Sequence, residues 1–343
     1  MKTTTISDIA LLSGVSKSTV SRVLTGNSFV DESKKIKILK AIEDTGYIPN
    51  TAAQSLRGRS TKSIGVILNL DPDYHFSDFV SMETLRGISS SAQMLGYRVS
   101  VIIEPCNQAL PKILREQSVD GIIVMGLKEK EEALFSLAKT DNSESPHVPI
   151  VLLNYSEEYK SFPSVSFDNE ENAYNFTRYI LSMGHQDIGL IDSSKDVLAV
   201  SNRKHGILRA FEESGIVFRS EWYFEYTNIN KMEAGRKVAI NFLQLEKKPS
   251  VVIASEDDIA LSFIAAVSSS GLKVPDDISV VGVDNIPMSQ YSNPPLTTEK
   301  VEGYRRGVMA FKMLKSLLDG EDLKEKHLKI RSVIVERNSL KKI

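Results

Sequence analysis

The side chains best suited to recognise a polyanion lie near the N-terminus, where Lys17, Ser18 and Arg22 fall within one expected helix. An arginine guanidinium can bond O6 and N7 of a guanine together, which makes Arg22 the strongest candidate for reading a base. The hydroxyl groups of Thr19 and Ser21 suit contacts to phosphate. These residue types predict nucleic-acid recognition; the alternative is that Lys17 and Arg22 only solvate a helix face.

A second candidate site involves Arg203 and Asp284, in the longer remainder of the chain. Asp284 follows an apolar run expected to form a buried strand, and open α/β sheets present ligand-binding groups at the carboxyl ends of their strands. A carboxylate accepts hydrogen bonds from vicinal hydroxyls and a guanidinium donates to them, so the pair suits a polyol. The alternative is a salt bridge between the two residues across a cleft.

The usual signals of enzymatic chemistry are missing from the sequence. It has no G-x-S-x-G, no P-loop, no G-x-G-x-x-G and no H-E-x-x-H motif. The five histidines are scattered, and the single cysteine, Cys106, can form neither an internal disulfide nor a cysteine-based metal cluster. We therefore predict that the protein is not an enzyme and uses no cofactor or metal.

Charge is distributed unevenly along the 343 residues, whose length predicts two or three domains. Residues 1–62 hold ten Lys and Arg against five Asp and Glu, a net of +5, and the remainder has a net of −7. A basic head on an acidic body indicates that the head meets a polyanion, unless the excess is a chance feature of a solvated surface. Because no apolar run reaches the ~18–20 residues of a membrane span and no signal-peptide core is present, we expect a soluble, cytoplasmic protein.

The first fifty residues predict three short helices. The first begins at a Thr5–Asp8 capping box and stops at Gly14, and the second is capped by Ser16 and runs to Leu24. The third begins near Asp31 or Ser33, ends at Gly46, and is expected to bury Ile36, Leu39 and Ile42. Two helices joined by a turn at Gly14, the second with a basic outer face, are typical of a helix-turn-helix.

A short amphipathic segment follows this head. Asn50 is a good cap for a helix over Thr51–Arg57 that Gly58 would close. Two turns are too few for a stable isolated helix in water, so this segment should need a partner to fold. We therefore expect a head over residues 1–49, a hinge helix and linker over 50–62, and a core over 63–343.

The core alternates buried strands with amphipathic helices, which predicts parallel, doubly wound sheets. The length is generous for one domain, so two α/β lobes with a cleft between them are expected: about 63–167 plus 300–325, and about 168–299 plus 326–340. A helix is expected over Arg305–Leu318 and a strand over Leu328–Glu336. The other expected strands are Ile64–Leu70, Val99–Ile103, Gly121–Met125, Ile150–Asn154, Ile188–Ile191, Val251–Ala254 and Ile278–Val283, and the expected helices cover 79–95, 169–183, 203–214, 231–245 and 258–270.

Several motifs in order along the whole chain carry a family resemblance. In the head they are Thr5–Ala10, Gly14–Ser16, Ser18–Gly26, Gly46–Asn50 and Ala53–Leu56. In the body they are Arg86-Gly-Ile, Val119–Ile122, Met183-Gly-His185, Arg203–Gly206, Ile278–Asn285 and Pro294–Thr298. These resemble the landmarks of the lactose/galactose-repressor (LacI/GalR) family of bacterial transcription regulators. The resemblance implies a homodimer on double-stranded operator DNA, with a periplasmic-binding-protein-like core that binds a small effector between its lobes.

The resemblance also implies roles for particular residues in binding DNA. Lys17, Ser18 and Arg22 occupy the positions with which the family reads bases, and Leu56 that of a wedge inserted into the minor groove. If it is not such a wedge, Leu56 packs against the core. The DNA-binding set implied by the family is Thr5, Ser16, Lys17, Ser18, Thr19, Ser21, Arg22, Asn50, Ala53 and Leu56.

For the effector the family implies Arg203 and Asp284, together with Asn69, Asn154, Phe167 and Glu256. Two features depart from the family. Glu256 adds an acid where many relatives have Asn or Thr, which favours uncharged or cationic ligands over phosphates, unless Glu256 faces solvent. Gly303 stands where some relatives place an aromatic residue, with Tyr304, Phe76 and Phe79 as possible substitutes.

We therefore predict an effector-responsive transcription regulator, a repressor of carbohydrate-utilisation genes that binds a pseudo-palindromic operator and senses a sugar-like ligand. Nucleobases and phosphoprotein co-regulators both occur in the family, so a regulator of nucleobase metabolism remains an alternative. A periplasmic-type solute-binding protein is another, although it would need a signal peptide and no basic head. A helix-turn-helix used for protein contacts would show no salt-dependent DNA binding.

Overall fold

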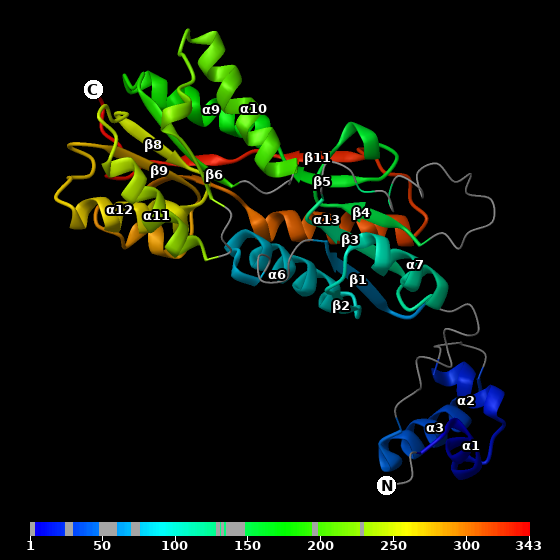
Figure 1. Cartoon of the computed structure of the whole chain (residues 1–343). Coiled ribbons are helices and arrows are strands. Elements are labelled where there is room, and N and C mark those ends of the chain that lie inside the picture. The colour runs from blue at the N-terminus through cyan, green and yellow to red at the C-terminus, as the bar shows by residue number, and fades with distance from the viewer. Residues whose placement is uncertain are drawn as a thin grey trace. The chain divides into compact units, whose positions relative to one another are not determined.

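A computed structural model describes residues 4–24, 30–47, 60–69, 76–127, 131, 134, 148–193, 198–226 and 230–343. The chain divides into two compact units, Met1–Thr61 and Lys62–Ile343 (Figure 1). Asn50, Ala53, Leu56 and the expected hinge helix lie outside the described residues. In the described part of the chain, no helix is long and apolar enough to cross a membrane.

The first unit is a small helical head made of α1 (Ile6–Ser13), α2 (Lys17–Leu24) and α3 (Glu32–Thr45). Each helix begins and ends close to the expected position. Thr5 caps α1 in a capping box with Asp8, and Gly14 ends it in the left-handed conformation at φ 68°. The core of the head is formed by Ile9, Ala10, Val20, Ile38 and Ala41.

The buried face of α3 differs from the expected one. Ile36 is 61% exposed and Leu39 is 50% exposed, whereas Ile38 and Ala41 are buried and Ile42 is partly buried. Two apolar stripes run along this helix, and the sequence pattern does not say which of them packs against α1. Our expectation that Ile36 and Leu39 are buried was therefore wrong: the buried face of α3 is rotated by about a third of a turn around the helix axis from the expected one.

The first lobe of the core is a parallel sheet in the order β11-β5-β4-β3-β1-β2. Helices α6 (Phe79–Met94), α7 (Cys106–Glu116) and α13 (Gly303–Leu318) belong to this lobe, and α13 returns to it from late in the sequence (Figure 1). The strands are β1 (Ser63–Leu68), β2 (Arg98–Ile102), β3 (Gly121–Met125), β4 (Ile150–Leu152), β5 (Ser164–Phe167) and β11 (His327–Ile330).

The second lobe repeats this plan with the order β12-β10-β9-β8-β6-β7, in which β12 is antiparallel to β10. Its helices are α9 (Asn169–Ser182), α10 (Leu198–Glu213), α11 (Lys231–Leu243) and α12 (Asp257–Ser269). The strands are β6 (Ile188–Ser193), β7 (Tyr223–Tyr226), β8 (Val251–Ala254), β9 (Ser279–Asp284), β10 (Thr297–Lys300) and β12 (Val333–Val335). The expected architecture of two parallel α/β lobes is confirmed.

The end of the chain differs from the expectation of one strand over Leu328–Glu336. The structure has two strands here, because β11 pairs with β5 in the first sheet and β12 pairs with β10 in the second. Residues 327–330 therefore belong to the first lobe and not, as expected, to the second. Within the described residues, the chain passes between the sheets around Asp168, at residues 301–302 and at residues 331–332.

Two glycines allow α6 and α13 to pack very closely. A Cβ atom on Gly87 would lie 2.2 Å from the carbonyl oxygen of Tyr304, and one on Gly307 would lie 2.1 Å from that of Thr84. Real side chains do not tolerate such distances to backbone. Because Gly303 packs in the same way against Val80, at 2.6 Å, no aromatic side chain fits at this position in this chain.

Candidate functional site

The outer face of α2 carries the side chains expected to read DNA. Lys17, Ser18 and Arg22 are exposed, while Val20 on the opposite face is fully buried. Ser18 and Arg22 are four residues apart and therefore point to the same side of the helix. The arrangement leaves a cationic fork and a hydroxyl group accessible on one surface, as a helix that enters a major groove requires.

Two other residues of the expected DNA-binding set begin helices. Thr5 Oγ1 donates to Asp8 Oδ2 at 2.7 Å, and Ser16 Oγ accepts a hydrogen bond from the Thr19 backbone at 3.2 Å. Ser16 Oγ also lies 2.8 Å from the hydroxyl oxygens of both Ser18 and Thr19. Thr5 and Ser16 therefore hold the ends of α1 and α2, and the N-terminus of α2 presents a cluster of hydroxyl groups.

In the core, side chains of both lobes line one cavity. The first lobe and the passage between the sheets contribute Asp78, Val80, Ser81, Met125, Gly126, Leu153, Asn154, Phe167, Val301 and Arg306. The second lobe contributes Asn169, Asn172, Ala199, Arg203, Glu256, Val283, Asp284 and, from β10, Glu299. A polar cavity between two lobes is a usual place for a small ligand.

Five of the six residues expected to contact an effector lie on this cavity: Asn154, Phe167, Arg203, Glu256 and Asp284. Glu256 is only 4% exposed, so it does not face bulk solvent. Asn69 does not line the cavity. Its amide nitrogen donates to Gly126 O and to Glu131 Oε2, at 3.1 and 2.6 Å, and its Oδ1 accepts from the Cys106 backbone at 2.6 Å.

The backbone at Asp284 is unusual. Asp284 and Asn285 have φ values of 114° and 56°, in a region that residues other than glycine seldom adopt. The neighbouring Asn285 is held by Arg337, which donates to its Oδ1 at 2.7 Å. This conformation ends β9 at the cavity. Burial, followed by the neighbouring carboxyls of Asp78 and Glu256, raises the pKa of Asp284.

A buried ion cluster forms part of the cavity wall. Lys231 Nζ lies 2.5 Å from Glu256 Oε2 and 3.3 Å from Asp78 Oδ1. Burial opposes ionisation of Asp78, but Lys231 and the hydrogen bond from Ser81 hold its pKa below the ordinary value. Burial also disfavours the charged form of Lys231, yet the two carboxylates raise its pKa. Burial raises the pKa of Glu256, an effect that Lys231 opposes and Asp78 reinforces. The Lys231 ammonium group and the Asp78 carboxylate are therefore charged together near neutral pH.

Arg306 and Glu299 complete the charged lining. The guanidinium of Arg306 lies over the Phe167 ring at 4.2 Å and donates to Thr84 Oγ1 at 3.0 and 3.3 Å. Burial raises the pKa of Glu299, an effect that Ser332 and Arg203 oppose. Four carboxyl groups and two guanidinium groups thus line the cavity.

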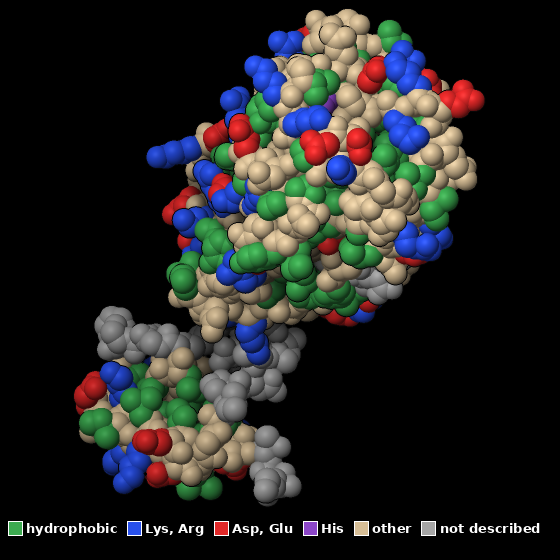
Figure 2. Space-filling view, turned by 90° about the vertical axis from the view of Figure 1, so that its left-hand side faces the viewer, with side chains coloured by type: hydrophobic (Ala, Val, Ile, Leu, Met, Phe, Trp, Pro, Cys, Tyr) green, Lys and Arg blue, Asp and Glu red, His purple; other side chains and the backbone are tan. Residues whose placement is uncertain are grey.

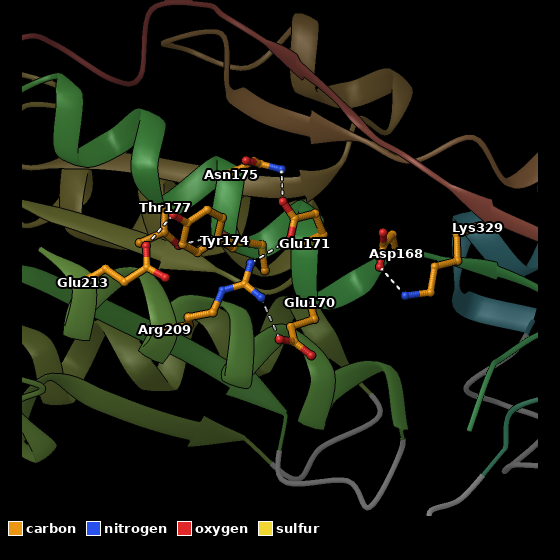
Figure 3. Close-up of polar contacts among 10 residues, drawn as sticks. Asp168, Glu170, Glu171, Tyr174, Asn175, Thr177, Arg209, Glu213 and Lys329 are labelled. Atoms are coloured by element: carbon orange, nitrogen blue, oxygen red, sulfur yellow. Dashed lines mark hydrogen bonds and ion pairs between the residues drawn. The ribbon is translucent and has the colours of Figure 1, made fainter. Parts of the chain in front are cut away.

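A second recess adjoins the cavity and shares Asn154, Phe167 and Asn169 with it. At its rim Lys329 of β11 pairs with Asp168 at 3.0 Å. Nearby, Arg209 of α10 bonds Glu170 and Glu171 of α9 at 2.9 and 2.7 Å (Figure 3). Figure 3 also shows Tyr174 beside Arg209, whose guanidinium lies 4.1 Å from the ring centre. These contacts fasten α10, which carries Arg203, to α9.

Three charged residues that line the cavity, Asp78, Glu299 and Arg306, were not expected from the sequence, and neither was Lys231, which contacts two of the lining carboxyl groups. Asp78 caps the start of α6, where an acidic residue is ordinary, and Lys231 is the first residue of α11. Glu299 lies in β10, a strand that the polar sequence Thr297–Lys300 did not predict. The only signal for these residues in the sequence was a charged side chain flanked by buried positions.

Tyr304, which was proposed as an aromatic substitute at the cavity, does not line it. The guanidinium of Arg86 lies 4.3 Å from the centre of its ring.

His185 has the structural place expected of it at the end of α9. Its ring nitrogens lie 2.8 Å from Ser250 Oγ and 2.9 Å from the Lys341 carbonyl oxygen, and burial lowers its pKa. It joins the helix end to β8 and to the C-terminal segment.

A helix-turn-helix head and a two-lobed α/β core with a polar cavity define a DNA-binding transcription regulator with a periplasmic-binding-protein-like core. The chain belongs to the lacI family of bacterial regulatory proteins, whose model matches residues 5–50. The model of the periplasmic binding protein-like domain matches residues 177–340. The protein is thus a DNA-binding transcription repressor and not an enzyme.

Similar proteins match over nearly the whole length. The HTH-type transcriptional repressor PurR of Vibrio campbellii is 31% identical, with 99% of each chain covered. The HTH-type transcriptional regulator RegA of Clostridium saccharobutylicum is 32% identical, with 98% of this chain and 99% of its own covered. Among solved structures, the lac repressor dimer bound to operator and the anti-inducer ONPF is 26% identical, with a TM-score of 0.85 and coverage of 99% and 100%.

Proposed function

We propose that this repressor binds a pseudo-palindromic operator as a homodimer and is controlled by a small, uncharged, sugar-like ligand in the cavity between its lobes. The observation that carries the proposal is the meeting of Arg203 and Asp284 at one cavity, although they are 81 positions apart in the sequence. A guanidinium donates to hydroxyl groups and a carboxyl group accepts from them. Carbohydrate-utilisation genes are the targets that such a ligand suggests.

The amide side chains of Asn154, Asn169 and Asn172 add neutral donors and acceptors to the lining, which suits a polyol. A nucleobase is the second candidate, because the Phe167 ring lies in the lining and offers a surface on which a flat heterocycle could stack.

The operator side of the proposal rests on the head. We propose that Lys17, Ser18 and Arg22 of α2 contact base edges and that Thr5, Ser16, Thr19 and Ser21 contact or position phosphates. Asn50, Ala53 and Leu56 are proposed to lie at the operator centre. The lac repressor structure to which this chain is similar contains a dimer on its operator.

Exposed apolar side chains support self-association of the core. Met82 of α6, Val101 of β2 and both Met232 and Ile240 of α11 are between 41% and 54% exposed. Figure 2 shows hydrophobic side chains more often in the lower part of this face of the core and charged side chains more often in its upper part. An apolar patch rimmed by polar groups is typical of a protein contact.

A thermal-shift panel of monosaccharides, disaccharides, sugar phosphates and purines tests the ligand. A ligand at 100 times its dissociation constant stabilises the folded protein by ~2.7 kcal/mol, which gives a clear rise in Tm. We expect a neutral sugar to raise Tm and the Arg203→Ala and Asp284→Asn variants to lose that rise. A rise with purines alone would favour the second candidate, and a rise that survives in both variants would contradict the cavity as the binding site.

A further inference from the structure

The position of Lys231 is costly unless it has a specific role. Lys231 is the first residue of α11 and is 7% exposed. A helix N-terminus carries partial positive charge, so an ammonium group there is disfavoured even in water, and burial adds to the cost. At the first residue of a helix, Asp, Glu or a neutral residue would be more stable than a lysine. The two carboxylates that contact Lys231 offset this cost.

Those two carboxylates come from different lobes. Asp78 is the N-cap of α6 in the first lobe, and its Oδ2 accepts from the Ser81 backbone at 2.7 Å. Glu256 is the N-cap of α12 in the second lobe, which also carries Lys231. The Lys231–Glu256 contact thus lies within one lobe, whereas the Lys231–Asp78 contact joins the two.

The remaining charges make this bridge necessary for a closed cavity. Asp78, Glu256 and Asp284 all face the same cavity, and the ammonium group of Lys231 contacts the first two. Buried like charges repel strongly because the surrounding dielectric is low. Without the ammonium group, the buried Asp78 carboxylate would lose the cation that offsets its burial and would face the Glu256 carboxyl group of the other lobe, so opening the cavity to water would be favoured over the closed arrangement.

We propose that Lys231 is a positioning residue that holds the two lobes closed over the effector cavity by pairing with Asp78. It fixes Asp78 and Glu256 in the wall and thereby sets the shape that a ligand meets. An effector that enters or leaves the cavity must break the contact between Lys231 and Asp78 or pass beside it. The pair therefore controls access to the site. The reference to an effector rests on the proposed function; the closure of the lobes does not.

The lobe separation can be measured directly by pulsed electron paramagnetic resonance on the full chain without ligand or DNA. Spin labels on Gln93→Cys in the first lobe and Lys273→Cys in the second use two exposed positions. The native Cys106 is buried and its pKa is raised, so it does not compete for the label. Dilution with unlabelled protein confines the signal to distances within one chain.

We expect Lys231→Met to lengthen and broaden the distance between the labels and Lys231→Arg to restore it. Lys237→Met is the matched control, because Lys237 lies on the same helix and its side chain is 63% exposed. Should Lys231→Met fail to fold, Asp78→Asn carries the test, since asparagine still caps a helix but lacks the charge. Asp78→Asn should open the lobes more than Glu256→Gln, because the Glu256 contact with Lys231 lies within one lobe.

Unchanged distances in folded Lys231→Met or Asp78→Asn would overturn the proposal, as would equal opening by Asp78→Asn and Glu256→Gln. The result is separable from the proposed function. If the label distances change as expected but no ligand raises Tm, the proposed contact between the lobes stands and the proposed sugar-binding function does not.

Discussion

Arg22 is the residue of the head whose truncation should separate specific from non-specific DNA binding. It is exposed on α2, and a guanidinium that bonds a guanine discriminates between sequences whereas a phosphate contact does not. We expect Arg22→Ala to weaken operator binding by ~1–3 kcal/mol and to affect random DNA much less. Fluorescence anisotropy on operator and random duplexes at one salt concentration measures both.

Lys37→Ala is the control for this experiment, since Lys37 is an exposed lysine on α3 rather than α2. Lys37→Ala should weaken binding to the operator and to random DNA by about the same factor, and this factor should be smaller than the loss that Arg22→Ala causes on the operator. Equal weakening on both duplexes for Arg22→Ala would reduce Arg22 to a phosphate contact.

Asp257 gives a pH dependence opposite to that of a usual carboxylate. Burial raises its pKa to about 6, although Ser289, Thr298 and the Ile286 backbone donate to it. Between pH about 4 and pH about 6 the unfolded chain has released a proton that the folded chain keeps, so this residue makes the free energy of unfolding fall as pH rises. Above pH about 6 its contribution is constant.

Asp257→Asn isolates that contribution, because the amide keeps most of the hydrogen bonds but does not titrate. Relative to the variant, the unmodified protein should lose up to about 3 kcal/mol of stability between pH 4 and pH 6. Urea unfolding of both proteins at pH 4, 5, 6 and 7 gives the difference. A constant difference over this range would mean that Asp257 has its ordinary pKa.

At the scale of elements, the contact between α6 and α13 depends on glycine. The Cβ of an alanine at 307 would meet the Thr84 carbonyl oxygen and the Ile88 nitrogen, at 2.1 and 2.8 Å, and backbone cannot yield without moving a helix. We expect Gly307→Ala to destabilise the core by ~1–3 kcal/mol, despite the better helix propensity of alanine. Ser89→Ala, at an exposed position of α6, should change stability by less than ~0.5 kcal/mol in the same urea titration.

Most elements could be predicted because the buried strands are continuous apolar runs, as in β1, β3 and β9. Strands β5, β7 and β10 were missed because polar residues interrupt them. In β10, Thr297 and Thr298 are buried with hydrogen-bonded hydroxyl groups, a compensation that no local pattern reveals. Helix α7 was missed for a related reason, since it contains Pro111.

The cavity was predictable where it lies at strand ends. Asn154 follows β4 and Asp284 is the last residue of β9, and parallel strands bring the residues at their carboxyl ends to one edge. Asp78, Lys231 and Arg306 lie on helices instead, and their meeting depends on how the lobes close. That arrangement is set by packing between distant segments, which hydrophobic periodicity does not encode.

At the scale of the whole molecule, the opposed charges of head and core assign DNA binding to the head. Residues 1–62 carry a net charge of +5 and the remainder −7, so the core should not add phosphate contacts. Operator affinity should fall with rising salt, since each phosphate that the head neutralises contributes about −0.9 to the slope of log K against log salt. Anisotropy titrations between about 50 and 200 mM salt measure that slope, and a flat response would exclude the head as a DNA-binding unit.

Dimerisation should be needed for tight operator binding, because two heads on one palindrome bind with the high effective concentration of a linked pair. Ile240→Glu places a charge in the exposed apolar patch of α11 and should shift the protein toward monomers in sedimentation velocity. Full-operator affinity should then fall by at least about tenfold, while binding to a half-site stays unchanged. Val217→Glu is the matched control, since Val217 is 77% exposed and lies outside α6, β2 and α11. If Ile240→Glu remains dimeric and binds the operator normally, the subunits meet through another surface.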